Sequence, residues 1–528
     1  MRPESLARSG ILSLVGSAFA ALAALGLTAL IGRGFGPEGT GVFFQGVAIF
    51  TVASQVLRLG TNSAIVRFTA SQRALTGVSD SWRIIIVSCL PVAIVAILVG
   101  ASFALFSAPL AAILAPIEQR DDLQQLLIQM PIFIAAGAIV SVLQTVLRMV
   151  AGVGAFTLLQ SILLPLSRLV ATAVVVALAL TARDAFLWWM LVLPAWLLVT
   201  VVVLIAPLRR EKRDRGSTAA PRVGFGEFWA FSGPRAVGSA LETGLDWSDV
   251  LIVAALTSPT QAGIYAVATR AVRAGQIVDR AMRIAVSPRI SALLAVGDLG
   301  TATRLHTAVA RLMILTAWPF YLTLALLGPA VLALFGAGFT VGAPALAILA
   351  IAMMVSAASG MLQSVLLQGG RSSWQMYNKA VVLGCNILLT LLLVPVIGIS
   401  GAAVSWVVSL ALDTGIAAWQ VHRLIGVRLQ PRSLLFAAAV PLVVFGVGCT
   451  ATRILAGDSL LGLAVGLPVT LIAYAVVVWT LRRRLGIHDA LDGVVRAVPG
   501  VRSIPFLRAA HSGSTKSAPH AAEHTPGP

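Results

Sequence analysis

Charged residues are scarce in this sequence: Asp, Glu, Lys and Arg make up 11% of its 528 residues, whereas 58% are hydrophobic. Soluble domains carry roughly 25% charged residues, so the composition excludes a large soluble domain. A helix that crosses a membrane needs about 20 apolar residues, and the apolar content is enough for about fourteen such helices. The sequence therefore predicts an all-α, polytopic membrane protein.

Cysteine is almost absent, and positive charge outnumbers negative charge. Cys89, Cys385 and Cys449 lie far apart inside apolar stretches, which excludes a disulfide framework and a cysteine metal site. The 38 Lys and Arg residues against 20 Asp and Glu give a net charge of +18. In a polytopic protein this surplus is typical of cytoplasmic loops, so we expect no nucleic-acid binding.

Signatures of an enzyme are missing as well. The sequence has no G-x-x-x-x-G-K-[ST] loop, which would cradle the phosphates of a nucleotide. The expected outer loops contain no His, and their one acidic cluster (Glu118, Asp121 and Asp122) lies in a short connection. A sugar-processing enzyme needs two carboxylates in a cleft. We therefore predict that the chain is not an enzyme and binds no cofactor or metal.

Apolar stretches predict fourteen transmembrane helices. They lie near residues 10–32, 40–60, 83–108, 127–149, 155–181, 185–207, 228–256, 260–289, 305–335, 342–367, 377–397, 400–421, 433–454 and 459–481. Lys and Arg accumulate in alternate connections, which predicts that both termini are cytoplasmic. The first stretch continues to about Ile31, too long for the apolar core of a signal peptide, so we expect it to remain as a span.

A short internal repeat relates the two halves of the chain. The matches share an offset of 222 positions and pair VGSA at 15–18 with VGSA at 237–240, Pro37 with Pro259, Gly41 with Gly263, Arg58 with Arg280 and Arg67 with Arg289. This offset maps each of the first six spans onto the span six later. Because six is even, both copies enter the membrane in the same direction. Transporters with such repeats bind their substrate between the lobes, near the bilayer midplane.

The repeat predicts two six-helix lobes followed by two extra helices. The predicted boundaries are an N-terminal lobe at 1–207, a basic cytoplasmic linker at 208–224, a C-terminal lobe at 225–424, helices 13 and 14 at 432–484, and a cytoplasmic tail at 485–528. The tail ends in small and polar residues that cannot bury a core, and most of it is predicted to be disordered.

Ionisable side chains concentrate in the seventh and eighth expected spans, where charge by default marks a pathway or a binding cavity. The seventh carries Arg235, Glu242, Asp246 and Asp249 on one helical face, and the eighth a stripe of Arg270, Arg273, Arg280 and Arg283. Asp246 and Arg270 each lie about 15 Å deep, so we expect them to pair, and likewise Glu242 with Arg273. Two interpretations stay open: an ion-pair ladder that joins the helices, or a cationic cavity whose surplus arginines bind another anion.

Other charged and aromatic residues are less distinctive. Arg168 in the fifth span and Asp413 in the twelfth fit a packing role as well as a ligand role. Arg58 and Arg67 lie near the expected cytoplasmic mouth, where contact with lipid phosphate is predicted. Four tryptophans are expected at the membrane interface: Trp188, Trp189, Trp229 and Trp479.

Two segments of the sequence carry motifs of a known protein family. Residues 27–70 contain a turn formed by Arg33, Gly36, Pro37 and Gly41 and a helix end with Gly60, Asn62, Ser63 and Arg67. This stretch resembles the start of the polysaccharide biosynthesis (oligosaccharide flippase) proteins, and residues 248–272 resemble that family's junction between helices 7 and 8. Thr40 replaces a common aromatic residue, and the basic tail is longer than usual.

The resemblance implies the fold of the multidrug/oligosaccharidyl-lipid/polysaccharide exporter superfamily, with two lobes that open alternately to each side of a bacterial plasma membrane. It also implies a substrate, an undecaprenyl-pyrophosphate-linked oligosaccharide moved to the outer leaflet. Guanidinium forks suit phosphate, so the predicted contacts to pyrophosphate are Arg235, Arg270, Arg273 and Arg168. Predicted supporting or coupling acids are Glu242, Asp246 and Asp249, and the predicted cytoplasmic mouth holds Arg58, Arg67 and Arg280. Expected partners are anionic membrane lipids and other polysaccharide-assembly proteins.

Three alternatives compete with this function. A flippase for the peptidoglycan lipid precursor shares the cationic cavity. A multidrug or metabolite antiporter of the same superfamily favours an acidic cavity for cationic substrates, the opposite of the balance in residues 228–289. A non-transporting scaffold for glycan assembly would use the linker at 208–224 and the tail as docking segments.

Overall fold

The computed structural model describes residues 3–215, 221–368, 372–427 and 431–487, and every regular element in them is helical. The first part of the chain forms α1 (Pro3–Val56), α2 (Thr61–Thr76), α3 (Ser81–Leu105), α4 (Ser107–Leu114), η1 (Ile117–Gln119), α5 (Arg120–Val150), α6 (Gly152–Phe156), η2 (Thr157–Leu163), α7 (Leu164–Ala177) and α8 (Ala182–Arg215). The predicted linker at 208–224 therefore begins as a continuation of α8.

The second part of the chain is built in the same way. It forms α9 (Phe225–Leu256), α10 (Pro259–Ala274), α11 (Gln276–Ala295), α12 (Leu299–Leu326), α13 (Gly328–Ala333), η3 (Ala337–Gly342), α14 (Ala343–Ala358), α15 (Leu362–Gln368), α16 (Ser372–Ile397), α17 (Ile399–Gln420), η4 (Val421–Ile425), α18 (Pro431–Ala456) and α19 (Leu460–Leu481). Nearly all of the predicted tail lies outside the described residues.

Eleven helical segments in the described residues are long and apolar enough to cross a membrane. The segment at 15–76 joins the first two expected spans, α9 carries several charged residues, and α10 has only 16 residues. The all-α membrane fold is thus confirmed, whereas the number of fourteen spans stays a prediction.

A sharp kink replaces the expected connection between the first two spans. Both spans lie in α1, which bends where Gly36 adopts a φ of 66° and is followed by Pro37. Glycine tolerates this left-handed conformation, and proline removes a backbone donor from the helix. The bend therefore needs no intervening loop.

The expected eighth span is broken, which corrects the prediction of one continuous arginine stripe. α10 ends at Ala274 and α11 begins at Gln276, with Gly275 between them. A Cβ atom at Gly275 would lie 2.7 Å from the Tyr321 ring of α12, so only glycine allows this approach. Arg270 and Arg273 consequently lie on a different helix from Arg280 and Arg283.

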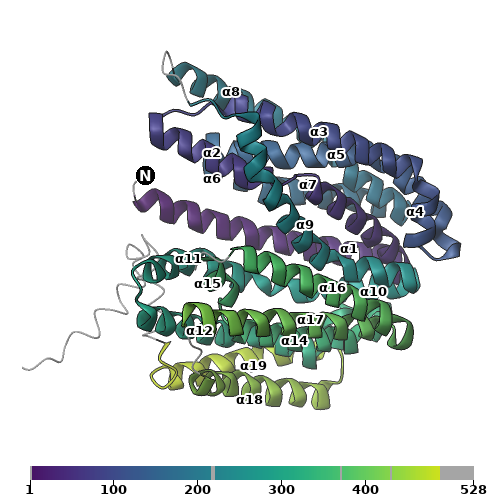
Figure 1. Cartoon of the computed structure of the whole chain (residues 1–528). Coiled ribbons are helices and arrows are strands. Elements are labelled where there is room, and N and C mark those ends of the chain that lie inside the picture. The colour runs from purple at the N-terminus through teal and green to yellow at the C-terminus, as the bar shows by residue number, and fades with distance from the viewer. Residues whose placement is uncertain (1–2, 216–220, 369–371, 428–430, 488–528) are drawn as a thin grey trace, which may run out of the picture.

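The buried hydrophobic residues form two separate cores. One extends from Ile31 to Phe228 and the other from Val250 to Leu485. Each core also takes one alanine from the other half, because Ala266 of α10 packs in the first and Ala48 of α1 in the second. Figure 1 shows the helices as two groups that converge at one end of the molecule and diverge toward the end where the N-terminus lies. The predicted domain boundaries and the repeat stay predictions.

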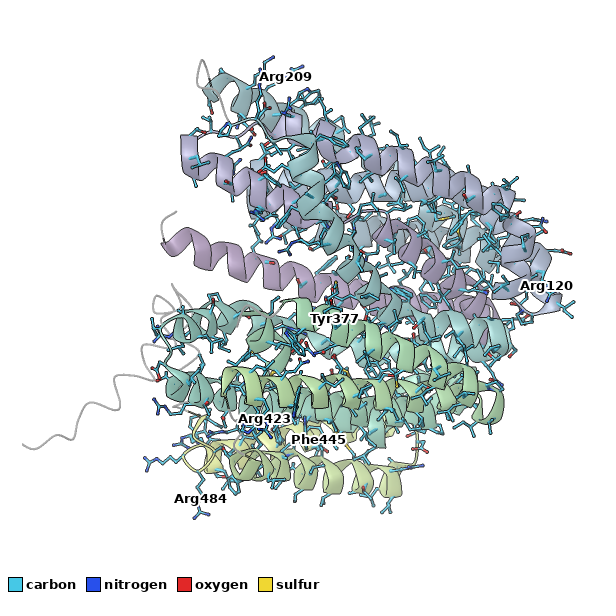
Figure 2. All side chains as sticks on the ribbon, viewed as in Figure 1. Arg120, Arg209, Tyr377, Arg423, Phe445 and Arg484 are labelled. Carbon is cyan, nitrogen blue, oxygen red and sulfur yellow. The ribbon has the colours of Figure 1, made fainter. Side chains whose placement is uncertain are left out.

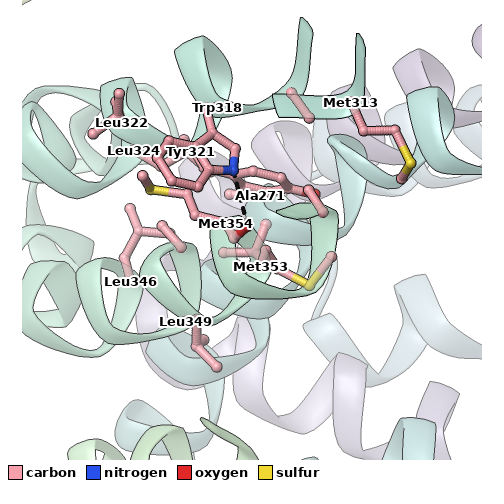
Figure 3. Packing of buried hydrophobic residues seen from close by; sticks show 14 of the residues in the cluster. Ala271, Met313, Trp318, Tyr321, Leu322, Leu324, Leu346, Leu349, Met353 and Met354 are labelled. Carbon is pink, nitrogen blue, oxygen red and sulfur yellow. Dashed lines mark hydrogen bonds between the residues drawn. The ribbon is translucent and has the colours of Figure 1, made fainter. Parts of the chain in front are cut away.

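The second core is tied together by α12 and α14. Trp318 donates from its indole nitrogen to the carbonyl oxygen of Met354, 2.8 Å away, and Met313 and Met353 pack nearby (Figure 3). Ala271 of α10 joins the same cluster. This packing of Ala271 therefore fixes the position of the part of α10 that carries Arg270.

Candidate functional site

A basic pocket of about 620 Å³ lies between α2, α5, α6 and α9. Three arginines line it, one each from α2, α5 and α9: Arg67, Arg148 and Arg235. The remaining lining residues are Asn62, Ser63, Val66, Thr145, Phe156 and Phe231, so no acidic residue contributes to its wall. We call this site the basic pocket.

The basic pocket exists because α9 approaches the start of α2 closely. Gly60 adopts a φ of 72°, and a Cβ atom there would overlap the carbonyl oxygen of Ser232. The Ser232 hydroxyl donates to the carbonyl oxygen of Leu59 over 2.7 Å. This contact fixes the first turns of α9 against α2 and places Arg235 beside Arg67.

Aromatic rings, rather than carboxylates, contact the arginines of the basic pocket and hold them in position. The Phe231 ring centroid lies 4.2 Å from the guanidinium carbon of Arg67 and 4.6 Å from that of Arg235. Arg148 lies 5.6 Å from the Phe156 centroid. A cation over a ring keeps its charge and its donors. None of the ion pairs in the described residues includes these three arginines, so the pocket carries an uncompensated positive charge.

Arg58 lies beside the basic pocket without lining it. Its guanidinium donates to the Ser141 hydroxyl of α5 over 3.3 Å. One helical turn further along α5, the Thr145 hydroxyl donates to the side-chain oxygen of Asn62 over 3.0 Å. These bonds align α5 with the start of α2, so Arg58 acts in the structure as a tie between the two helices.

Arg270 and Arg273 form a second group, away from the basic pocket, where α10 meets α1 and α9. The Arg270 guanidinium lies 3.8 Å from the Phe44 ring centroid and 5.4 Å from that of Trp247. Arg273 lies 5.7 Å from the Trp247 centroid and donates to the backbone carbonyl of Asp246. Arg270 thus reaches across from the second half of the chain to α1 of the first half.

The predicted pairs of Asp246 with Arg270 and Glu242 with Arg273 are absent among the described residues. Asp249 is buried and accepts a hydrogen bond from the Tyr265 hydroxyl over 2.8 Å, while Glu242 and Asp246 are exposed. The expected ladder fails because Arg270 stacks on rings and Asp249 is satisfied by a hydroxyl. Arg283 with Asp279 is the one pair that the predicted stripe supplies in the described part of the chain.

Arg168 is separated from the other arginines. Its guanidinium lies 3.7 Å from the Trp189 ring centroid, and its Nε atom is buried without a partner. Trp189 itself is only 6% exposed, which corrects its expected position at the membrane interface. A row of edge-on rings runs from Trp189 through Phe43 to Phe44, the ring under Arg270.

A second, smaller cavity of about 340 Å³ lies in the second half of the chain, and we call it the balanced cavity. Its charged lining residues are three acids and three bases: Asp246, Asp279, Asp413, Arg280, Arg283 and Lys379. Lys379 pairs with Asp413 over 2.8 Å, and the two side chains are 17% and 8% exposed. Arg280, predicted at the cytoplasmic mouth, is thus found beside acids in this cavity.

α1 and α10 make a reciprocal contact that we call the closed end. A Cβ atom at Gly41 would overlap the carbonyl oxygen of Pro259, and one at Gly263 would overlap that of Pro37. Pro37 and Gly41 are the residues that the sequence repeat pairs with Pro259 and Gly263. Such a symmetric contact is expected at a pseudo-two-fold axis, and it leaves no space between the two helices.

Three important residues were not singled out as site residues by the sequence. They are Arg148, Phe231 and Lys379. Arg148 and Phe231 are 83 positions apart and meet only through the packing of α5 and α9 around α2. Lys379 and Asp413 are isolated charges inside apolar stretches of the sequence, and this feature could have predicted that they pair.

Comparison with known proteins identifies the family. The sequence pattern of the family described as polysaccharide biosynthesis protein matches residues 6–294, more than half of the chain. The chain belongs to the polysaccharide biosynthesis protein family. No curated protein matches this family member in sequence.

Solved structures share the fold of this polysaccharide biosynthesis protein. The lipid II flippase MurJ, in an inward closed conformation, gives a TM-score of 0.68 at 12% identity over 89% of this chain and 99% of that chain. An inward-facing MATE family multidrug transporter of the MOP superfamily gives 0.59 at 14% identity over 79% and 98%. A variant of the Vibrio cholerae MATE transporter VcmN gives 0.55 at 16% identity over 80% and 97%. The chain is thus a multi-pass membrane protein with the MOP superfamily fold.

Proposed function

We propose that this protein moves an undecaprenyl-pyrophosphate-linked oligosaccharide from the cytoplasmic to the outer leaflet of a bacterial plasma membrane. The observation that carries the proposal is the basic pocket, where Arg67, Arg148 and Arg235 face one space with no acid. A pyrophosphate group is at least doubly anionic, and guanidinium groups bind phosphate oxygens through paired, charge-assisted hydrogen bonds. Family membership supports a role in surface polysaccharide assembly.

The shape of the molecule supports alternating access as the mechanism. The closed end seals α1 against α10 through Gly41 and Gly263. α2 and α6, which contribute to the lining of the basic pocket, lie toward the diverging end in Figure 1. Figure 2 places Arg209 and Arg484 at that diverging end and Arg120 at the opposite one. Arg209 and Arg484 belong to the basic runs 209–215 and 482–484, and such runs are typical of the cytoplasmic side, which supports a cytoplasmic orientation for the diverging end. The substrate would enter the basic pocket from the cytoplasm and leave when the closed end separates.

Arg270 and Arg273 supply the second contact in this scheme. They lie at the junction of α1, α9 and α10, where the two halves of the chain meet. A headgroup that leaves the basic pocket for the outer side has to pass this junction. The rings of Phe44 and Trp247 and the backbone carbonyl of Asp246 would keep the two guanidinium groups oriented before the headgroup arrives. Arg168 would act indirectly through the ring row that ends at Phe44.

The experiment is a flipping assay in proteoliposomes with the purified full chain and a fluorescent lipid-linked saccharide. Substitution of Arg67, Arg148 or Arg235 with Ala should weaken the apparent affinity for this lipid-linked saccharide by about tenfold or more, because each substitution removes a charge-assisted hydrogen bond. The matched control is Arg304→Ala, an exposed arginine that contacts Thr301 outside the basic pocket. Unchanged flipping by a variant in which Arg67, Arg148 and Arg235 are all replaced with Ala would contradict the proposal.

Lipid II is the second candidate substrate. It is favoured by the overlap with MurJ, of which 99% is covered at a TM-score of 0.68. The same assay run with both lipids separates the candidates, because only one of them should be flipped at full rate. A cationic drug substrate is disfavoured, since the basic pocket contains no acid to receive it. A scaffold without transport would show no flipping of any lipid.

A further inference from the structure

A large groove lies outside the basic pocket, on the flank of the first half of the chain. It has a volume of about 1180 Å³ and is lined by the start of α3, the end of α5 and the end of α8. α3 and α8 both pack on α5, so α5 forms the floor of the groove and the other two helices form its walls. Its apolar part includes Ile86, Val201 and Ile205, whose side chains are between 41% and 50% exposed.

One end of this groove is polar and carries charges of both signs. Arg83, Arg209 and Lys212 line it together with Asp80 and Glu211. Asp80 caps α3, since its carboxylate accepts from the backbone N–H of Arg83 over 3.2 Å. The groove thus has an apolar length that suits an acyl chain and a charged end at the level where α3 begins.

Glu211 leaves an acceptor unused at the charged end. Its Oε1 atom accepts from the backbone N–H of Ser81 over 2.9 Å, whereas its Oε2 atom is buried and has no partner. A buried carboxylate oxygen without a hydrogen-bond donor is costly. A ligand with a positively charged N–H donor would satisfy this Glu211 oxygen, and a phosphate on the same ligand would contact Arg209 and Lys212.

We propose that this groove binds a phospholipid with a primary ammonium headgroup, phosphatidylethanolamine. Glu211 lines the groove, and its carboxylate turns toward the headgroup to accept from the ammonium group. The phosphate contacts Arg209 and Lys212, and an acyl chain lies along Ile86 and Ile205 on the α5 floor. A quaternary ammonium headgroup has no N–H to donate, and a glycerol headgroup has no positive charge. The site is separate from the basic pocket and does not depend on the transport function.

The test is native mass spectrometry of the purified full chain, titrated with phosphatidylethanolamine, phosphatidylcholine and phosphatidylglycerol of identical acyl chains. We expect phosphatidylethanolamine to bind about tenfold more tightly than phosphatidylcholine, as one charge-assisted hydrogen bond implies. Glu211→Gln keeps an acceptor for Ser81 but removes the charge, and it should abolish this preference. The control Asp214→Asn changes an exposed acid on the same helix outside the groove and should leave the preference intact.

Several outcomes would overturn the assignment. Equal binding of phosphatidylethanolamine and phosphatidylcholine would remove the role of the free Glu211 oxygen. A preference for phosphatidylglycerol or for a polyprenyl phosphate would mean that the groove selects negative charge through Arg209 and Lys212 alone. An unchanged preference in Glu211→Gln would place the ethanolamine site elsewhere. A further variant, Lys212→Ala, should bind less phosphatidylethanolamine, because the phosphate loses a contact. It should still prefer phosphatidylethanolamine over phosphatidylcholine, because Glu211 remains; loss of that preference would contradict the assignment.

Discussion

The basic pocket and the balanced cavity contain the same number of basic side chains and differ in their acids. The basic pocket has three arginines and no acid, and the balanced cavity has three bases with three acids. In the first, rings of Phe231 and Phe156 hold the guanidinium groups, whereas in the second Lys379 is joined directly to Asp413. Positive charge that is held without being neutralised is available to a ligand. Charge that is paired inside the protein contributes to its structure instead.

The largest effect is expected from breaking the pair in the balanced cavity. Lys379→Ala leaves Asp413 buried, 8% exposed, and without its cation. Removing one partner of a buried pair costs about 3 to 5 kcal/mol, so the apparent unfolding temperature should fall clearly. Thermal unfolding of the detergent-solubilised protein measures this. The double variant Lys379→Met with Asp413→Leu removes both charges and should recover most of the loss; a single variant as stable as the parent would contradict the comparison.

A smaller effect is expected from giving the basic pocket an acid of its own. Arg148→Glu makes its charge pattern resemble that of the balanced cavity. The change removes one charge-assisted contact and adds a repulsion, so affinity for a soluble prenyl pyrophosphate should fall by about 2 kcal/mol or more. Fluorescence titration of the purified protein measures it. Arg304→Glu makes the same charge change outside the pocket, and an equal loss there would show that only total charge matters.

The smallest effect is expected from removing the ring that Arg67 and Arg235 share. Phe231→Leu keeps an apolar side chain but removes both cation–π contacts, each worth about 0.5 to 1 kcal/mol. The affinity for the same pyrophosphate should fall about fivefold, with little change in unfolding temperature. Phe225→Leu is the control on the same helix. Unaltered affinity would mean that the rings do not orient the guanidinium groups.

The positions of individual side chains show why the sequence predicted one cationic cavity and the structure contains separate groups. Helical spacing placed Arg235, Asp246 and Asp249 on one face of 228–256, but it carries no information on which helix packs against that face. Gly60 brings the start of α9 to α2, so Arg235 joins Arg67 rather than Arg270. The break at Gly275 depends on Tyr321, a residue 46 positions away.

The sequence by itself determined that this is an all-α membrane protein and that it belongs to the polysaccharide biosynthesis protein family. Apolar content and the motifs at 27–70 are local properties, so they can be read without knowing the packing. Only the tertiary structure decided which arginines face one another, that Phe231 serves two of them, and that Lys379 neutralises Asp413. Those contacts join residues on different helices, and their distances depend on how glycines such as Gly60 and Gly275 let the helices approach.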